Sequence, residues 1–187
     1  MIRLKKILQE DIESIETDIF AKENNPDYEL LYDGWLERGK TAAEYLIKKG
    51  FSKIIAAAFI GNFAVESGVR PNVSQNLTKA LKLGFGFKPT TPTIALKQPS
   101  TSGYGLAQWT ENRKTNLISY GASSTTQQLD FLIAELNGSQ STAWKKIKTQ
   151  TSIADATEAI VLYYERAGKQ ALSDRINKAT SIYNQLK

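Results

Sequence analysis

The sequence predicts a mainly helical domain of the α+β type, with a small lobe rich in Gly, Pro and Thr that forms a loop or a β-hairpin beside a cleft. Two patterns support this fold class. Apolar residues recur at helical spacing, with capping residues between them, over residues 41–68 and again from residue 127 to the end. Over residues 72–102 this pattern gives way to Gly, Pro, Thr and Ser. A length of 187 residues allows one domain with an ample core and an appendage.

The first two helices are predicted from their caps. Thr41 and Glu44 have the spacing of a capping box, and Gly50 supplies a stop after the apolar positions that follow. A second helix then runs from Ser52 to Gly68. Because this helix is apolar on nearly every side, we expect it to be buried against other helices, with the first helix as its hairpin partner.

The remaining elements follow in chain order. Long structureless loops are rare in compact domains, so we expect one or two short strands or a functional flap over residues 72–102. Helices resume over residues 127–137, before Gly138, and around residues 144–147. Ser152 with Asp155 caps the next helix, which runs to Gly168. A last helix is predicted over residues 172–186.

The composition narrows the chemistry, because the chain contains no histidine and no cysteine. Ser-His and Cys-His nucleophiles, His-ligated zinc and disulfide scaffolds are therefore excluded, which leaves carboxylates for acid–base chemistry. We expect no metal and no cofactor. No apolar run is long enough to span a bilayer, and the amino terminus lacks the layout of a signal peptide, so we expect a soluble chain with no membrane partner.

Charge divides the chain near Gly39. Residues 1–37 hold 4 basic and 10 acidic residues, a net charge of −6, whereas residues 38–187 hold 20 and 9, a net charge of +11. We therefore predict an acidic helical appendage over residues 1–37 and a main domain over residues 38–187. The basic domain suits an anionic polymer, such as nucleic acid or the bacterial cell wall. Its lysines are spread out rather than clustered with stacking aromatic residues, which argues against nucleic acid.

The appendage carries an apolar stripe at helical spacing over residues 4–19, and this stripe needs a partner surface. Packing on the main domain of the same chain is one interpretation. Docking to another protein is the alternative.

Nine side-chain carboxylates lie in the main domain. Five have structural assignments, in helix caps or on the solvated faces of amphipathic helices: Glu44, Asp155, Asp130, Glu135 and Glu158. Four remain as candidates for chemistry: Glu66, Glu111, Glu165 and Asp174.

Glu66 is the leading candidate for a general acid. It ends the buried helix, so its carboxyl loses hydration and also meets the negative end of the helix macrodipole. Both effects favour the protonated form that a general acid requires near neutral pH. The alternative is a helix-terminal glutamate that points into water before a Gly68 cap.

Residues 103–109 (Gly-Tyr-Gly-Leu-Ala-Gln-Trp) form a second candidate segment. Its glycines permit close backbone approach, while Tyr104, Gln108 and Trp109 offer the stacking faces and the amide that sugars use. A Gly-x-Gly turn beside a core tryptophan is the structural alternative.

Several blocks of the sequence together resemble the phage tail lysozyme family, in that family's order. They are residues 42–46, 49–52, 56–62, 65–68 with Pro71, 103–109 with Arg113, 128–132 with Glu135 and Leu136, and 164–168 with Ala171 and Arg175. The chain departs from the family at Ala167-Gly168, where a proline often follows the family's Glu-Arg pair. The role of Glu165 therefore stays open, and a buried partner of Arg166 or Arg175 is one alternative.

The resemblance implies a lysozyme-like domain that cuts the glycan strands of peptidoglycan at the β-1,4 bond between N-acetylmuramic acid and N-acetylglucosamine. Goose-type lysozymes and lytic transglycosylases are relatives. Their Glu-Ser pair maps to Glu66-Ser67, with Glu66 as the catalytic acid, and their Gly-Leu-x-Gln stretch maps to residues 105–108. Gln108, Tyr104 and Trp109 would position the sugars, and Tyr164 would hydrogen-bond Glu66 or its water.

The resemblance also favours a location in the phage virion, with residues 1–37 docked to a tail or baseplate protein. A free endolysin that remains in the host cytoplasm until lysis and an inactive virion structural module are the alternatives. A second carboxylate is not identified, so a retaining, an inverting and a transglycosylase outcome all stay open.

Overall fold

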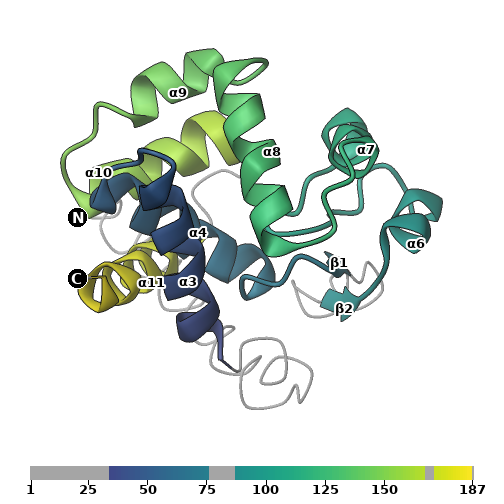
Figure 1. The fold of residues 1–187 in the computed structure, drawn as a ribbon, viewed down its shortest axis with the longest axis horizontal. Coiled ribbons are helices and arrows are strands. Elements are labelled where there is room, and N and C mark those ends of the chain that lie inside the picture. Colours follow the sequence, from purple (N-terminus) through teal and green to yellow (C-terminus); the bar gives the residue numbers. More distant parts are fainter. Residues whose placement is uncertain (1–33, 76–86, 167–170, 187) are drawn as a thin grey trace, which may run out of the picture.

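A computed structural model describes residues 34–75, 87–166 and 171–186, and these are mainly helical with one small sheet. The predicted fold class is confirmed. Helices gather around a central helix, α4, while the sheet and two further helices lie together at one end of the molecule (Figure 1). None of the helices in the described part of the chain has the length and apolar character needed to cross a membrane.

Helix α4 (Lys53–Ser67) forms where the sequence predicts it. The Ser52 hydroxyl accepts the N–H of Ile55 at its start, and Gly68 ends it in the left-handed conformation, at φ 60°. Nearly every side chain between these caps is buried, against α3 (Trp35–Lys48), α10 (Ile153–Ala159) and α11 (Leu172–Gln185). The helix that carries Glu66 is thus held on several sides.

The capping box predicted at Thr41 and Glu44 is wrong, because α3 begins before both residues, at Trp35. Thr41 lies inside the helix, where its hydroxyl donates to the backbone carbonyl of Glu37 (3.1 Å). The charge boundary near Gly39 also falls within this continuous helix. Residues 1–33 lie outside the described residues, so the separate appendage stays a prediction.

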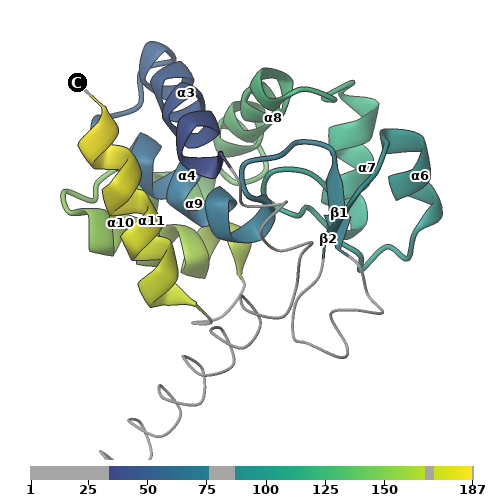
Figure 2. The same ribbon diagram turned by 90° about the horizontal axis from the view of Figure 1, so that it is seen from below.

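Two glycines let α11 approach its neighbours closely. A Cβ atom added at Gly61 of α4 would lie 2.5 Å from the Cβ of Ala179 and 2.6 Å from its backbone. A Cβ atom at Gly39 of α3 would lie 2.9 Å from Cδ1 of Ile182. Figure 2 shows α11 beside α3 and α4 on the side of the molecule away from the sheet. The crossing at Gly61 is therefore tight enough to fix the register between α4 and α11.

The strands expected over residues 72–102 are confirmed in the described part of that segment. Strands β1 (Val73–Gln75) and β2 (Phe87–Pro89) pair antiparallel, with Val73 opposite Pro89. Tyr104 continues the pairing by bridging to Ser74 and to Trp109. Helices α6 (Pro92–Lys97) and α7 (Glu111–Ser119) complete this lobe. The predicted functional flap would include residues 76–86, which lie outside the described residues.

The later helices match the prediction with one difference. Helix α8 (Thr125–Asn137) starts with a capping box of Ser124 and Gln127, α9 (Ser141–Ile147) follows, and Ser152 caps α10. The sequence predicted an uninterrupted helix from there to Gly168. Instead, α10 continues as a π-helical segment, η1 (Ile160–Glu165), and ends at Arg166 in the left-handed conformation. Gly168 lies outside the described residues.

Candidate active site

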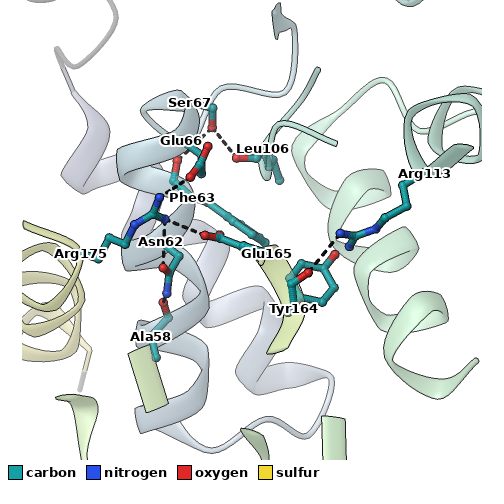
Figure 3. Close-up of polar contacts among 10 residues, drawn as sticks. All are labelled: Ala58, Asn62, Phe63, Glu66, Ser67, Leu106, Arg113, Tyr164, Glu165 and Arg175. Carbon is teal, nitrogen blue, oxygen red and sulfur yellow. Dashed lines mark hydrogen bonds and ion pairs between the residues drawn. The ribbon is translucent and has the colours of Figure 1, made fainter. Parts of the chain in front are cut away.

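Glu66 lies in the last turn of α4, where the helix bundle meets the segment that contains Leu106 (Figure 3). Its side chain is 20% exposed, so the carboxyl is neither in the core nor free in water. It accepts a hydrogen bond from NH2 of Arg175, which belongs to α11. The carboxyl has the reduced hydration that the sequence predicts, and a guanidinium is part of its surroundings.

Arg175 is the centre of this polar cluster. Its side chain is 4% exposed, and its NH1 donates to Oε2 of Glu165 (2.7 Å) and to Oδ1 of Asn62 (3.1 Å). Asn62 lies one turn before Glu66 on α4, and its own amide donates to the Ala58 carbonyl (2.8 Å). Arg175 stands one turn before Ala179, the residue that crosses Gly61, so the tight crossing sets Arg175 against Asn62 and Glu66.

Glu165 ends the π-helical segment and approaches the same guanidinium from another side. Its side chain is 4% exposed, and its Oε1 is buried with no hydrogen-bond partner among the described residues. Burial, with the nearby charge of Glu66, raises the pKa of Glu165 from 4.5 to about 8, against the opposing effects of Arg175 and Arg113. The alternative that Glu165 is a buried partner of Arg175 is confirmed, whereas Arg166 donates to Gln140 instead.

Ser67, the neighbour of Glu66, joins the two segments that the family resemblance singled out. Its hydroxyl lies 2.8 Å from the Leu106 carbonyl and 3.0 Å from the Phe63 carbonyl, and can donate to either. Leu106 is held from the other side by Gln128 of α8, whose Oε1 accepts its N–H (2.9 Å). Gly105 is required here: its φ is 80°, and a Cβ atom would lie 2.6 Å from Gln128 Oε1. Residues 103–109, called the glycine loop below, are thereby fixed against the end of α4.

Gln108 stabilises the same loop through hydrogen bonds of its side-chain amide. Its amide nitrogen donates to the carbonyls of Gly105 (2.8 Å) and Val73 (3.3 Å), while its Oε1 is buried without a partner in the part of the chain that the structure describes. Its backbone is left-handed, at φ 48°. In this structure the amide therefore holds the loop and the first strand together.

The structure does not favour the expected contacts of Tyr104 and Trp109 with sugars, because both side chains, like that of Tyr164, are at most 1% exposed. Trp109 packs between Phe63 and Phe131, with ring centroids 6.2 and 5.6 Å away. The Tyr104 hydroxyl donates to Asn72 Oδ1 (3.1 Å), and burial raises its pKa to about 12. Large aromatic rings beside a glycine turn fill the core here, where a sugar cannot reach them.

Tyr164 was expected to hydrogen-bond Glu66, but its hydroxyl donates to Oε2 of Glu135 (2.7 Å). Glu135 also accepts from Nε1 of Trp109 (3.0 Å) and from both Nε and NH2 of Arg113 (2.8 Å each). Its assignment to a solvated helix face is wrong, since it is 6% exposed. Phe131 and Leu132 stand four and three residues before it, so its place on the apolar face of α8 was the missed signal.

The other two candidate carboxylates take no part in the cluster around Arg175. Glu111 is exposed at the start of α7. Asp174 pairs with Lys178 on the same helix (3.7 Å). Among the described residues, no three side chains that could ligate a metal come together.

Comparison with known proteins adds an independent observation. A search of curated proteins gave no match. The family model described as phage tail lysozyme matches residues 37–186, which covers the bundle, the lobe and the cluster around Arg175. The chain therefore belongs to the phage tail lysozyme family.

Proposed function

We propose that this protein is a muramidase that cleaves the β-1,4 bond between N-acetylmuramic acid and N-acetylglucosamine, with Glu66 as the general acid. Family membership supports the general function, a lysozyme-like peptidoglycan hydrolase that acts on the cell wall. The position of Glu66 supports its role as the acid, since its carboxyl is partly exposed while the hydroxyl of its neighbour Ser67 is hydrogen-bonded to the Leu106 carbonyl. The net charge of +11 over residues 38–187 favours an anionic wall polymer.

In this mechanism the Glu66 carboxyl gives its proton to the glycosidic oxygen as the bond from that oxygen to C1 of the muramic acid breaks. The electron pair of that bond stays on the departing oxygen, which leaves as a hydroxyl. Water then adds to C1, with its proton returning to Glu66, and yields a reducing end. If the C6 hydroxyl of the same sugar adds instead, the product is an anhydro-muramic end.

Glu165 is the described carboxylate that shares a guanidinium with Glu66. A nucleophile or a base that activates water must reach the sugar, and a side chain 4% exposed and bound to Arg175 is poorly placed for this. This burial favours a route without a protein nucleophile. It is also the observation that keeps the lytic transglycosylase as the second candidate.

Mass spectrometry of digested peptidoglycan tests the proposal directly. We expect fragments with reducing N-acetylmuramic acid ends. Anhydro-muramic ends would establish the transglycosylase instead, and N-acetylglucosamine reducing ends would contradict the proposed bond. Intact glycan strands after incubation with folded protein would favour the alternative of an inactive structural module.

We further propose that Gln108, Tyr104, Trp109 and Tyr164 stabilise the structure around Glu66 and do not contact the sugar. Gln108 holds the glycine loop, Tyr104 anchors the sheet, and Trp109 and Tyr164 bind the buried Glu135. Sugar contacts would then come from the loop backbone and from Glu66 itself.

For delivery, we propose that the protein is carried in the phage tail through residues 1–37. The net charge of −6 and the apolar stripe support this proposal. The described structure suggests a cleaner truncation after residue 33, because Trp35 and Leu36 pack on the core. Deletion of residues 1–33 is expected to preserve digestion of purified wall but abolish co-purification with phage particles. Unfolding of the truncated chain, with loss of cooperative melting, would contradict a docking role.

A further inference from the structure

The charges around Arg175 do not balance when every group is ionised, because one guanidinium serves two carboxylates. NH2 contacts Glu66 and NH1 contacts Glu165, and both nitrogens are bonded to the same carbon. Arg175 and Glu165 are each 4% exposed and Glu66 is 20% exposed. Two negative charges against one positive charge would leave a net charge in a largely buried site, which is unfavourable. A single proton on the pair makes the cluster neutral.

Resting on the proposed function, in which Glu66 is the acid, we propose that Glu165 is a positioning residue that keeps the catalytic proton at this site, by competing with Glu66 for Arg175. While both carboxyls are present, Arg175 can neutralise one of them, and the other keeps the proton. Without the Glu165 carboxylate, Arg175 would pair with Glu66 alone. The site would then lack the proton that the acid step requires.

The exposures of the two carboxyls indicate where the proton is held and where it is used. Glu165 is the more buried, and its raised pKa follows from that burial and from the charge of Glu66. Glu66 is the more exposed of the two carboxyls, at 20%. A sugar bound against Glu66 would remove the remaining hydration of that carboxyl. This favours movement of the proton to Glu66, while Arg175 then neutralises the charge of Glu165.

Four other cations of the described elements around the site have partners of their own. Arg113 of α7 is bound by both oxygens of Glu135 of α8. From α3, Arg38 donates to the carbonyl of Gly68 (2.8 Å). Arg166 after η1 donates to Gln140, and Lys178 of α11 pairs with Asp174. Arg175, by contrast, contacts both carboxyls directly.

The test is the pH dependence of kcat/KM for the full-length Glu165→Gln variant on soluble glycan strands. The amide keeps the shape of the side chain and removes its charge. The alkaline limb, which reports loss of the proton from the acid, is expected to move to lower pH by about one to three units, the usual effect of an unshared opposite charge. Activity is therefore expected to fall at pH 7, and to fall much less at pH 5.

Matched variants separate this role from a structural one. Glu165→Asp keeps the charge and is expected to restore most of the alkaline limb, and Glu44→Gln, at an exposed position of α3, is expected to change nothing. An equal loss of activity at every pH, or an unmoved limb, would overturn the proposal. The proposed function is judged separately by the Glu66→Gln variant. If Glu66→Gln is inactive and the alkaline limb of Glu165→Gln does not move, only the inference about Glu165 is rejected.

Thermal unfolding supplies a readout that does not depend on activity. Because the folded pKa of Glu165 lies above its unfolded value, the folded state binds more protons between pH 4.5 and about 8. The stabilisation from this proton is complete below pH 4.5 and is lost as pH rises through 8. Glu165→Gln is expected to flatten this decline in Tm. An unchanged slope would show that Glu165 does not hold the proton and would overturn the inference.

Discussion

Glu66→Gln is expected to lower the rate of wall digestion by about two to four decades, the usual contribution of a positioned general acid. The amide keeps the volume of the side chain and its contact with Arg175 but has no acidic proton. The rate is measured as release of soluble fragments from purified wall, with the folded fraction checked by circular dichroism. Binding to the wall should persist, because the charge that attracts the polymer is spread over the domain.

Glu44→Gln is the matched control, since it makes the same chemical change at an exposed position. It is expected to digest wall at the normal rate. Full lytic activity in Glu66→Gln would remove Glu66 from the mechanism. Loss of both activity and cooperative unfolding would indicate that the carboxylate mainly stabilises Arg175.

Trp109→Ala is expected to lower the free energy of unfolding by about 3–5 kcal/mol, the range for removal of a large buried aromatic side chain. Trp109 is 1% exposed and packs against Phe63 and Phe131, so the truncation leaves a cavity beside α4 and α8. A small domain has about 5–15 kcal/mol of stability in total, so this loss is severe. Urea unfolding measures it.

Trp109→Phe separates packing from the hydrogen bond. Phenylalanine keeps most of the ring contacts but loses the Nε1–H bond to Glu135, and is expected to lose about 1–3 kcal/mol. Its activity per folded molecule should equal that of the unchanged protein. A stable Trp109→Phe variant with impaired digestion would restore the sugar-contact role that the burial of this residue argues against.

Features that depend on neighbouring residues could be predicted from the sequence. Ser52, Ser152 and Gly68 act as caps because a cap needs only its own helix. The buried character of α4 followed from its composition. The error at Thr41 has the same origin, since the local pattern fits a capping box and only the actual start at Trp35 excludes it.

The surroundings of the candidate acid could not be predicted in this way. Arg175 comes to Glu66 through the crossing of Gly61 with Ala179, a contact between helices far apart in sequence. Its position four residues before Ala179, on the buried face of the last helix, was the available signal. The sequence could not separate sugar contact from core packing for Tyr104 and Trp109, because aromatic rings beside glycines suit both, and only the packing shows that these two are buried.

The last helix has a consequence for the timing of activity. Glu66 and Arg175 are 109 residues apart in the chain, so the helix that carries Arg175 is synthesised well after the helix that carries Glu66. Contacts over such long separations form late, after the cost of closing the loop between them has been met. A nascent chain therefore lacks the arginine that contacts its candidate acid until α11 has been synthesised. The fold itself delays enzymatic competence until the whole domain has left the ribosome.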